Sequence, residues 1–443
     1  MPRSKPPRRG FRDGLAALLL LAIPVAAALL LVRGDATGRE GGTGAQATLS
    51  LVDALGGADT VGYARALEPR PFVFPADHGP HPDFRSEWWY FTGNLEGEDG
   101  ARYGFQFTIF RGALAPPPAQ DGRPIAAARS PGEPDAAGAT GANDEAEATA
   151  TNAWDTRQVY LGHFAVTDAE TGIFREFERY TRGAAGLAGA QASPLRVWLD
   201  DWELVEAPGD PGAGDAVWPM RLTARDTAVG LELELVPRKP PVLQGDRGLS
   251  QKGSEPGNAS YYYSYTRLAA EGTVVVEGER RPVSGEAWLD REWSTSALSD
   301  GQVGWDWFAL QLSDGRDVMV YQLRREDGTA DSLSKGVVVA SDGSSRTLPL
   351  DDFEVMPTGT WDSAIDGSTY PSGWTVRIPA EGIDLTVTPV IEDQELDVSY
   401  RYWEGAVDVE GTSNGGAVSG RGYVELTGYA GAEAGLRVSG EGG

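Results

Sequence analysis

The segment 285–293 places charged side chains between tryptophans. It reads Gly-Glu-Ala-Trp-Leu-Asp-Arg-Glu-Trp, and Gly-Trp-Asp-Trp-Phe follows at 304–308. In an extended strand, alternate side chains share a face, so Trp288, Asp290 and Glu292 lie together. The other face carries Leu289, Arg291 and Trp293. Acids beside large aromatic rings are typical of a cavity wall, because an exposed tryptophan gains little from burial.

This pattern indicates acid chemistry on an apolar molecule. Carboxylates two residues apart on one strand are separated by about 7 Å. On a dry face, burial and mutual repulsion raise the pKa of one carboxyl, which then stays protonated near neutral pH. Such an acid can protonate an alkene, and indole rings can stabilise the resulting cation. We therefore predict Asp290, Glu292 and Arg291 as catalytic residues. A structural alternative is that the two acids form ion pairs with Arg291, Arg267 or Arg85.

Aromatic and histidine residues elsewhere supply the predicted ligand site. Its members are Glu87, Trp88, Trp89, Tyr90, His163, Tyr263, Trp288, Trp293, Trp305 and Trp307, with His78 and His81 as polar support. Strand alternation sends many of these aromatic rings into plain core. Zinc held by the three histidines with Glu87 or Asp290 is the weaker alternative, because their spacing is loose. We therefore predict neither a metal nor a cofactor.

An internal duplication must position these residues. Trp88-Trp89-Tyr90-Phe91 recurs as Trp305-Asp306-Trp307-Phe308, and Val283-Ser-Gly-Glu-Ala-Trp-Leu-Asp recurs as Val418-Ser-Gly-Arg-Gly-Tyr-Val-Glu. The repeat sets Glu425 against Asp290 and Tyr423 against Trp288, so only the first copy keeps the full constellation. Each unit has the size of one all-β domain, and the seam lies near 296–303.

Alternating segments dominate both units, beginning with a hairpin signal over 87–95 and 103–111. Hairpin-linked strands remove exposed edges by closing, which predicts an all-β protein of two tandem lipocalin-like antiparallel barrels. The predicted parts are a signal peptide or anchor (1–33), a flexible tether (34–68), a first barrel (69–298) with insertions at 113–153 and 238–258, and a second barrel (299–443).

The N-terminus predicts export. Five basic residues precede an apolar run over 15–32, which as a helix spans about 27 Å, close to the hydrocarbon core of a bilayer. Basic residues stay on the cytoplasmic side, so the globular part lies outside the cytoplasm. Arg33-Gly34-Asp35 offers no clear cleavage site, which favours a membrane anchor. Arg8-Arg9 resembles a twin-arginine signal, and an ordinary basic region explains it equally well.

Composition excludes several classes of function. The net charge of −27 repels nucleic acid backbones, and the absence of cysteine excludes disulfides and thiolate metal sites. A phosphate-binding loop before a helix and a Gly-x-Ser-x-Gly elbow are both missing, which weighs against nucleotide-dependent and serine-hydrolase activities.

The chain resembles a known family. The resemblance is carried by Asp77-His-Gly-Pro-His-Pro, Glu87-Trp-Trp-Tyr, Gly162-His-Phe-Ala-Val-Thr-Asp, Ala287-Trp-Leu-Asp-Arg-Glu-Trp and Gly304-Trp-Asp-Trp. These motifs are similar to those of the lipocalin-like group of carotenoid 1,2-hydratases (hydroxyneurosporene synthases) and AttH-type secreted hydrolases, and more to the exported AttH branch. The resemblance implies a tandem calycin-like fold, an apolar or isoprenoid-like ligand, and an acid at the position of Asp290 that protonates a terminal alkene.

Together these observations predict an exported, membrane-tethered protein that binds a hydrophobic small molecule and hydrates or hydrolyses it. One alternative is a non-catalytic lipid carrier or an accessory protein of an ABC-type membrane transporter. Another is a pocket that templates the cyclisation of a polyene through its shape.

Overall fold

The computed structural model describes residues 60–118, 156–296 and 298–430. The predicted anchor, most of the predicted tether and most of the predicted insertion at 113–153 lie outside these residues. Within the described ranges, no helix combines the length and apolar character that crossing a membrane requires.

The described residues form β-strands and three short 3₁₀ turns, without an α-helix, which confirms the all-β prediction. The strands of the first sheet are β1 (Ser86–Gly97), β2 (Arg102–Ala113), β3 (Gln158–Asp168), β4 (Ile173–Arg182), β5 (Ala188–Ala192), β6 (Leu195–Leu199), β7 (Trp202–Glu206), β8 (Met220–Asp226), β9 (Val229–Pro237), β10 (Val242–Leu243), β11 (Leu249–Gln251), β12 (Ala259–Val276) and β13 (Glu279–Ser294).

The strands of the second sheet are β14 (Gln302–Leu312), β15 (Asp317–Arg325), β16 (Lys335–Val339), β17 (Ser345–Pro349), β18 (Glu354–Pro357), β21 (Trp374–Ile378), β22 (Ile383–Pro389), β23 (Glu395–Leu396), β24 (Tyr402–Ser413) and β25 (Gly416–Leu426). A separate ribbon pairs β19 (Thr360–Asp362) with β20 (Thr369–Pro371). The 3₁₀ turns are η1 (Ala76–His78), η2 (Leu350–Asp352) and η3 (Pro379–Glu381).

The first sheet is a nearly closed antiparallel barrel. Its eleven main strands follow the order β4-β3-β2-β1-β13-β12-β9-β8-β7-β6-β5, and β10 and β11 add to β12. Side chains from both ends of this path meet inside, where the ring of Trp202 lies 5.7 Å from that of Phe164. Alternation along each strand sends one row of apolar residues into this interior, including Trp89, Phe91, Phe105 and Leu289.

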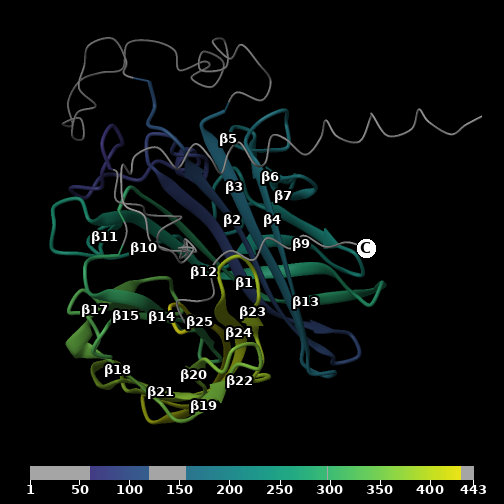
Figure 1. The fold of residues 1–443 in the computed structure, drawn as a ribbon. Helices are drawn as coiled ribbons and strands as arrows, with labels where there is room; N and C mark the ends of the chain where they lie inside the picture. The colour runs from purple at the N-terminus through teal and green to yellow at the C-terminus, as the bar shows by residue number, and fades with distance from the viewer. Residues whose placement is uncertain (1–59, 119–155, 297, 431–443) are drawn as a thin grey trace, which may run out of the picture. The chain divides into compact units, whose positions relative to one another are not determined.

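The second sheet is a curled half-barrel, so the prediction of two closed barrels is confirmed only for the first half. Its path is β17-β16-β15-β14-β25-β24-β22-β21-β18, and the two edge strands have only five and four residues. Strands this short leave too little backbone to pair across the gap. Its own core packs on the concave side around Trp374, Phe308 and Trp403. In Figure 1 the first sheet runs from purple to green and the second from green to yellow.

A third apolar cluster fills the space between the two sheets. It joins Tyr90, Tyr262 and Trp288 of the first sheet with Trp307 and Tyr423 of the second. Buried hydrogen bonds and ion pairs stabilise the same interface. Asp317 on β15 accepts hydrogen bonds from Lys239 Nζ at 2.7 Å and from Arg267 Nη2 at 2.7 Å. Charges buried this deeply are stable only when paired, so the two sheets are held in one arrangement.

Candidate functional site

A cavity of about 150 Å³ lies between the two sheets, not inside either one. Its walls combine aromatic rings with carboxyl groups. The lining residues are Ser86, Trp88, Tyr90, Phe110, Lys252, Tyr262, Asp290, Glu292, Ser294, Ser296, Leu298, Trp305, Trp307, Tyr321, Leu323, Tyr402, Glu404 and Glu425. Such a mixture of apolar surface and a few convergent polar groups is typical of a small-molecule site.

Strand register brings Asp290 to the centre of the first wall. On β13 it pairs with Tyr90 of β1 on one side and with Ser264 of β12 on the other. Its carboxylate accepts hydrogen bonds from Tyr262 Oη at 2.5 Å, Ser264 Oγ at 2.5 Å and Trp288 Nε1 at 2.7 Å. No described basic side chain forms an ion pair with it. The predicted sharing of one face by Trp288, Asp290 and Glu292 is therefore confirmed.

Burial raises the pKa of Asp290 to about 7, although the three donors favour the ionised form. The side chain is 4% exposed, so water screens the carboxyl very little. A carboxyl with this pKa exchanges its proton near neutral pH, which is the property expected of a general acid or base.

Glu292 is held differently. Lys252 Nζ lies 3.2 Å from Glu292 Oε1 and sits over the ring of Tyr321 at 4.7 Å. Burial lowers the pKa of Lys252, but the nearby Glu292 carboxylate outweighs it and the pKa is raised, so the lysine stays charged. Glu292 therefore forms an ion pair, as the structural alternative predicted for both acids, but with a lysine instead of an arginine. Lys252 belongs to 238–258, the segment predicted to be a polar insertion.

The second sheet contributes two more carboxyl groups, which the sequence analysis did not assign to the site. Glu404 on β24 and Glu425 on β25 face each other as a cross-strand pair. Burial raises the pKa of Glu425 to about 8, and it raises that of Glu404 well above its ordinary value. No described group makes a hydrogen bond of normal geometry to either oxygen of Glu404. The duplication was the available signal, because it sets Glu425 against Asp290.

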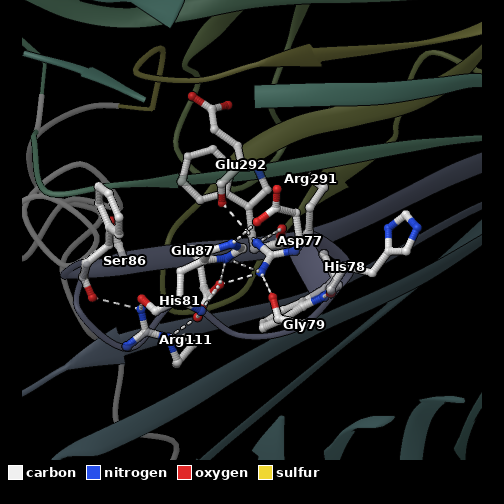
Figure 2. Close-up of polar contacts among 12 residues, drawn as sticks. Asp77, His78, Gly79, His81, Ser86, Glu87, Arg111, Arg291 and Glu292 are labelled. Carbon is white, nitrogen blue, oxygen red and sulfur yellow. Dashed lines mark hydrogen bonds and ion pairs between the residues drawn. The ribbon is translucent and has the colours of Figure 1, made fainter. Parts of the chain in front are cut away.

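Four other predicted residues of β1 and β13 point the other way, into the first barrel: Glu87, Trp89, Arg291 and Trp293. The guanidinium of Arg291 forms a close ion pair with Glu87 and lies 3.9 Å from the ring centre of Trp89. Arg111 forms a second close ion pair with the same carboxylate. Figure 2 shows these groups converging, whereas Glu292 points away from them. Burial raises the pKa of Glu87, but the two guanidinium groups outweigh burial and hold this pKa well below its ordinary value.

His78 and His81 belong to the same side of the barrel wall. The ring of His81 stacks on that of Trp293, with 3.7 Å between the ring centres. Its Nδ1 lies 3.2 Å from the Glu87 carboxylate, and both residues are labelled in Figure 2. His78 contacts the Tyr263 hydroxyl at 2.5 Å. None of the residues on this side lines the cavity; they are His78, His81, Glu87, Tyr263 and Trp293, together with Trp89 and Arg291. Their contacts hold the segment before β1 against the barrel.

Six of the predicted residues do meet at the cavity: Trp88, Tyr90, Asp290, Glu292, Trp305 and Trp307. Trp288 lies directly behind the wall as a donor to Asp290. His163 is also one step removed, because its Nδ1 contacts the hydroxyl of the lining residue Tyr402 at 2.8 Å. In the described part of the chain, no three His, Asp or Glu side chains gather closely enough to hold a metal ion.

Comparisons with known proteins place this architecture. The model of the AttH family, described as AttH-like, matches residues 65–131 and 138–429. Kievitone hydratase of Fusarium solani subsp. phaseoli is 23% identical over 230 residues, covering 49% of this chain and 63% of that relative. The match thus spans less than two thirds of the relative's length.

Two solved structures share the fold. A crystal structure of a provisionally assigned AttH from Nitrosomonas europaea has a TM-score of 0.66 and 33% identity, covering 83% of this chain and 100% of that one. Kievitone hydratase from Nectria haematococca has a TM-score of 0.57 and 17% identity, covering 84% of this chain and 99% of that one. Because the family model spans most of the sequence, this protein belongs to the AttH-like family.

Proposed function

We propose that the protein binds an apolar, alkene-containing molecule of isoprenoid or lipid type between its two sheets and adds water to the double bond. One observation supports this proposal above all others. Asp290 is a buried acid on an aromatic cavity wall, it has no basic partner among the described residues, and its pKa is about 7. An acid with that pKa is about half protonated at neutral pH, and it can give up its proton at modest cost.

In the proposed step, the O–H proton of Asp290 moves to one alkene carbon, and the electron pair of the double bond forms the new C–H bond. The other carbon becomes positively charged. The rings of Trp88, Trp305 and Trp307 border the space that this cation occupies and attract it through their π-faces. A lone pair of a water molecule then forms the C–O bond, and the water gives up one proton to the wall.

Three hydrogen-bond donors surround the carboxyl of Asp290. They stabilise the carboxylate that remains after proton transfer, so they favour the charge that develops during the reaction. Lys252 meanwhile forms an ion pair with Glu292, whereas no described basic side chain pairs with Asp290.

The comparisons support a hydro-lyase type of reaction without identifying the substrate. Kievitone hydratase, by its name, hydrates kievitone, and it is a distant relative of this chain. We also propose that the two sheets descend from duplicated lipocalin-like barrels, with their boundary near 298. The apolar run over 15–32 would anchor the protein in a membrane, with the folded part outside the cytoplasm.

The test is incubation of the full chain with kievitone and with a panel of isoprenoid alkenes in D₂O, followed by mass spectrometry. We expect product with one added water and one deuterium on carbon. Asp290→Asn should abolish this product while tryptophan fluorescence still reports binding. Asp306→Asn is the matched control, because Asp306 is also buried, with a pKa of about 6, but pairs with Arg324 and does not line the cavity.

Other outcomes separate the alternatives. Binding without any product, unaffected by Asp290→Asn, would replace the enzyme with a carrier or transporter accessory protein. A product of unchanged mass but altered connectivity would replace it with a cyclisation template, which depends on shape more than on charge.

A further inference from the structure

His163 is a buried histidine that connects the cavity with the edge of the molecule. It lies on β3 and is fully buried, with Phe110 packed against its ring at 5.6 Å. Its Nδ1 lies 2.8 Å from the hydroxyl of Tyr402, and its Nε2 lies 3.6 Å from a carboxylate oxygen of Glu178. Glu178, His163 and Tyr402 therefore form a row of polar groups, in which the step from His163 to Glu178 is an ion-pair distance longer than a hydrogen bond.

Three strands from both sheets build this chain. His163 and Glu178 are cross-strand neighbours on β3 and β4, whereas Tyr402 begins β24 of the second sheet. Ser399, just before β24, donates to Glu178 Oε2 from its backbone N at 2.9 Å and from its hydroxyl at 2.6 Å. The same segment thus fixes both ends. Glu178 remains 19% exposed at its side chain, whereas Tyr402 lines the cavity.

Hydrogen-bonding rules determine the direction of this chain. Burial raises the pKa of Glu178, but the nearby His163 ring and the hydrogen bonds from Ser399 outweigh it and hold this pKa below its ordinary value. Glu178 is therefore a carboxylate, which only accepts. A ring proton on Nε2, the nitrogen that faces this carboxylate, is the tautomer that the charge of Glu178 favours. With that tautomer Nδ1 has a free lone pair, and the hydroxyl of Tyr402 donates to it.

From this geometry we infer that Tyr402, backed by His163 and Glu178, is a further catalytic residue that accepts the proton lost by the attacking water. The inference rests on the proposed hydration. As the C–O bond forms, the water proton moves to the Tyr402 oxygen while the Tyr402 proton moves to His163 Nδ1. The imidazolium is stabilised by Glu178. The proton later returns by the same route and, through a water molecule, restores Asp290.

This arrangement follows the logic of an acid–histidine–hydroxyl triad. No tyrosinate has to form, which matters because burial raises the pKa of Tyr402 well above its ordinary value. Glu404 on the same wall is the other polar group near this hydroxyl, but neither of its oxygens lies in normal hydrogen-bond geometry to a described group. Burial raises the pKa of Glu404 well above its ordinary value, which makes it a weaker acceptor than the imidazole.

The chain contains a natural control for this inference. His78 contacts the Tyr263 hydroxyl at 2.5 Å and the Asp215 carboxylate at 2.9 Å, so the same three groups occur again. Tyr263, however, is fully buried inside the first barrel and does not line the cavity. Asp215, His78 and Tyr263 therefore have no contact with the proposed reactant. Substitutions among them serve as controls for purely structural effects.

The first experiment needs no ligand. In full-length protein labelled with ¹⁵N-histidine, only three residues give signals, and His163→Gln assigns the signal of His163. We expect His163 to carry its proton on Nε2, and we expect Glu178→Gln to mix the two tautomers. Tyr263→Phe should change the signal of His78 and leave that of His163 in place. A proton on Nδ1 of His163 in the unmodified protein would overturn the inference, because Tyr402 could then not donate to that nitrogen.

The second experiment uses the alkene from the panel that the unmodified protein hydrates fastest. Tyr402→Phe should lower turnover by about 100-fold or more, with the dissociation constant of the alkene nearly unchanged. A loss of threefold or less would overturn the inference and leave Asp290 as the acid. If no alkene in the panel is hydrated, the proposed hydration fails by itself, and the tautomer measurement alone decides whether the triad exists.

Discussion

Replacing Asp290 by asparagine should change how the stability of the protein depends on pH. The pKa of this carboxyl is 3.8 ordinarily and about 7 in the folded protein. Between these values the folded state binds a proton that the unfolded state has released. The raised pKa of Asp290 therefore leaves the free energy of unfolding unchanged below about pH 4. It lowers this free energy progressively between about pH 4 and pH 7, and by a constant amount above about pH 7.

The magnitude follows from the same two values. The difference between 3.8 and about 7 corresponds to ~4 kcal/mol. An asparagine side chain does not titrate, so the variant escapes this cost. It instead leaves Tyr262, Ser264 and Trp288 with a poorer acceptor, a penalty of about 1–3 kcal/mol that is independent of pH. Asp290→Asn should therefore be less stable than the native chain in acid and more stable in mild alkali.

Urea unfolding of both proteins from about pH 4 to about pH 8 measures this crossing as the difference between their unfolding free energies. Asp306→Asn provides the comparison, because the pKa of Asp306 is about 6 and its pH-dependent difference should level off near pH 6. A difference between the native chain and Asp290→Asn that stays constant across this range would refute the reasoning. Asp290 would then be hydrated or paired, and its role as a neutral acid would be lost.

Three further substitutions test other parts of the structure. Arg291→Ala should lower the unfolding free energy by about 3–5 kcal/mol, because Glu87 loses one of its partners inside the barrel; a change below about 1 kcal/mol in urea titrations would contradict this. Asp317→Ala should cost a similar amount by leaving Lys239 buried and unpaired between the sheets, and hydrogen exchange of β15 amides should become faster. Trp305→Ala should weaken binding of a hydrated alkene about tenfold in fluorescence titrations, whereas equal affinity would show that the ligand lies elsewhere.

Much of the local structure could be predicted from the sequence. Alternation along 286–293 separated Asp290 from Arg291, because successive side chains of any strand point to opposite faces. The hairpin signal over 87–95 and 103–111 became β1 and β2. The length of the strands was less visible. β12 runs unbroken over 18 residues, and its pairing with β13 shifts at a bulge between Tyr265 and Leu268.

The site itself was only half predicted. The residues on the first wall carried a clear signal because acids and tryptophans alternate within a few positions. No sequence pattern pointed to Lys252, because it lies in a polar segment outside β13 and contacts Glu292 only in the folded protein. Glu404 lies in a strand whose neighbours resemble ordinary core, and only its cross-strand partner Glu425 had been matched to Asp290.

Sequence by itself determined the all-β class and the face on which each side chain of β13 lies, because these follow from covalent geometry and short-range periodicity. Tertiary structure alone decided that one face of β13 borders a cavity while the other fills a barrel. It also set Tyr402 and His163 in contact, although they stand 239 positions apart. Such contacts depend on how two finished sheets pack, and local patterns of residues carry no record of that packing.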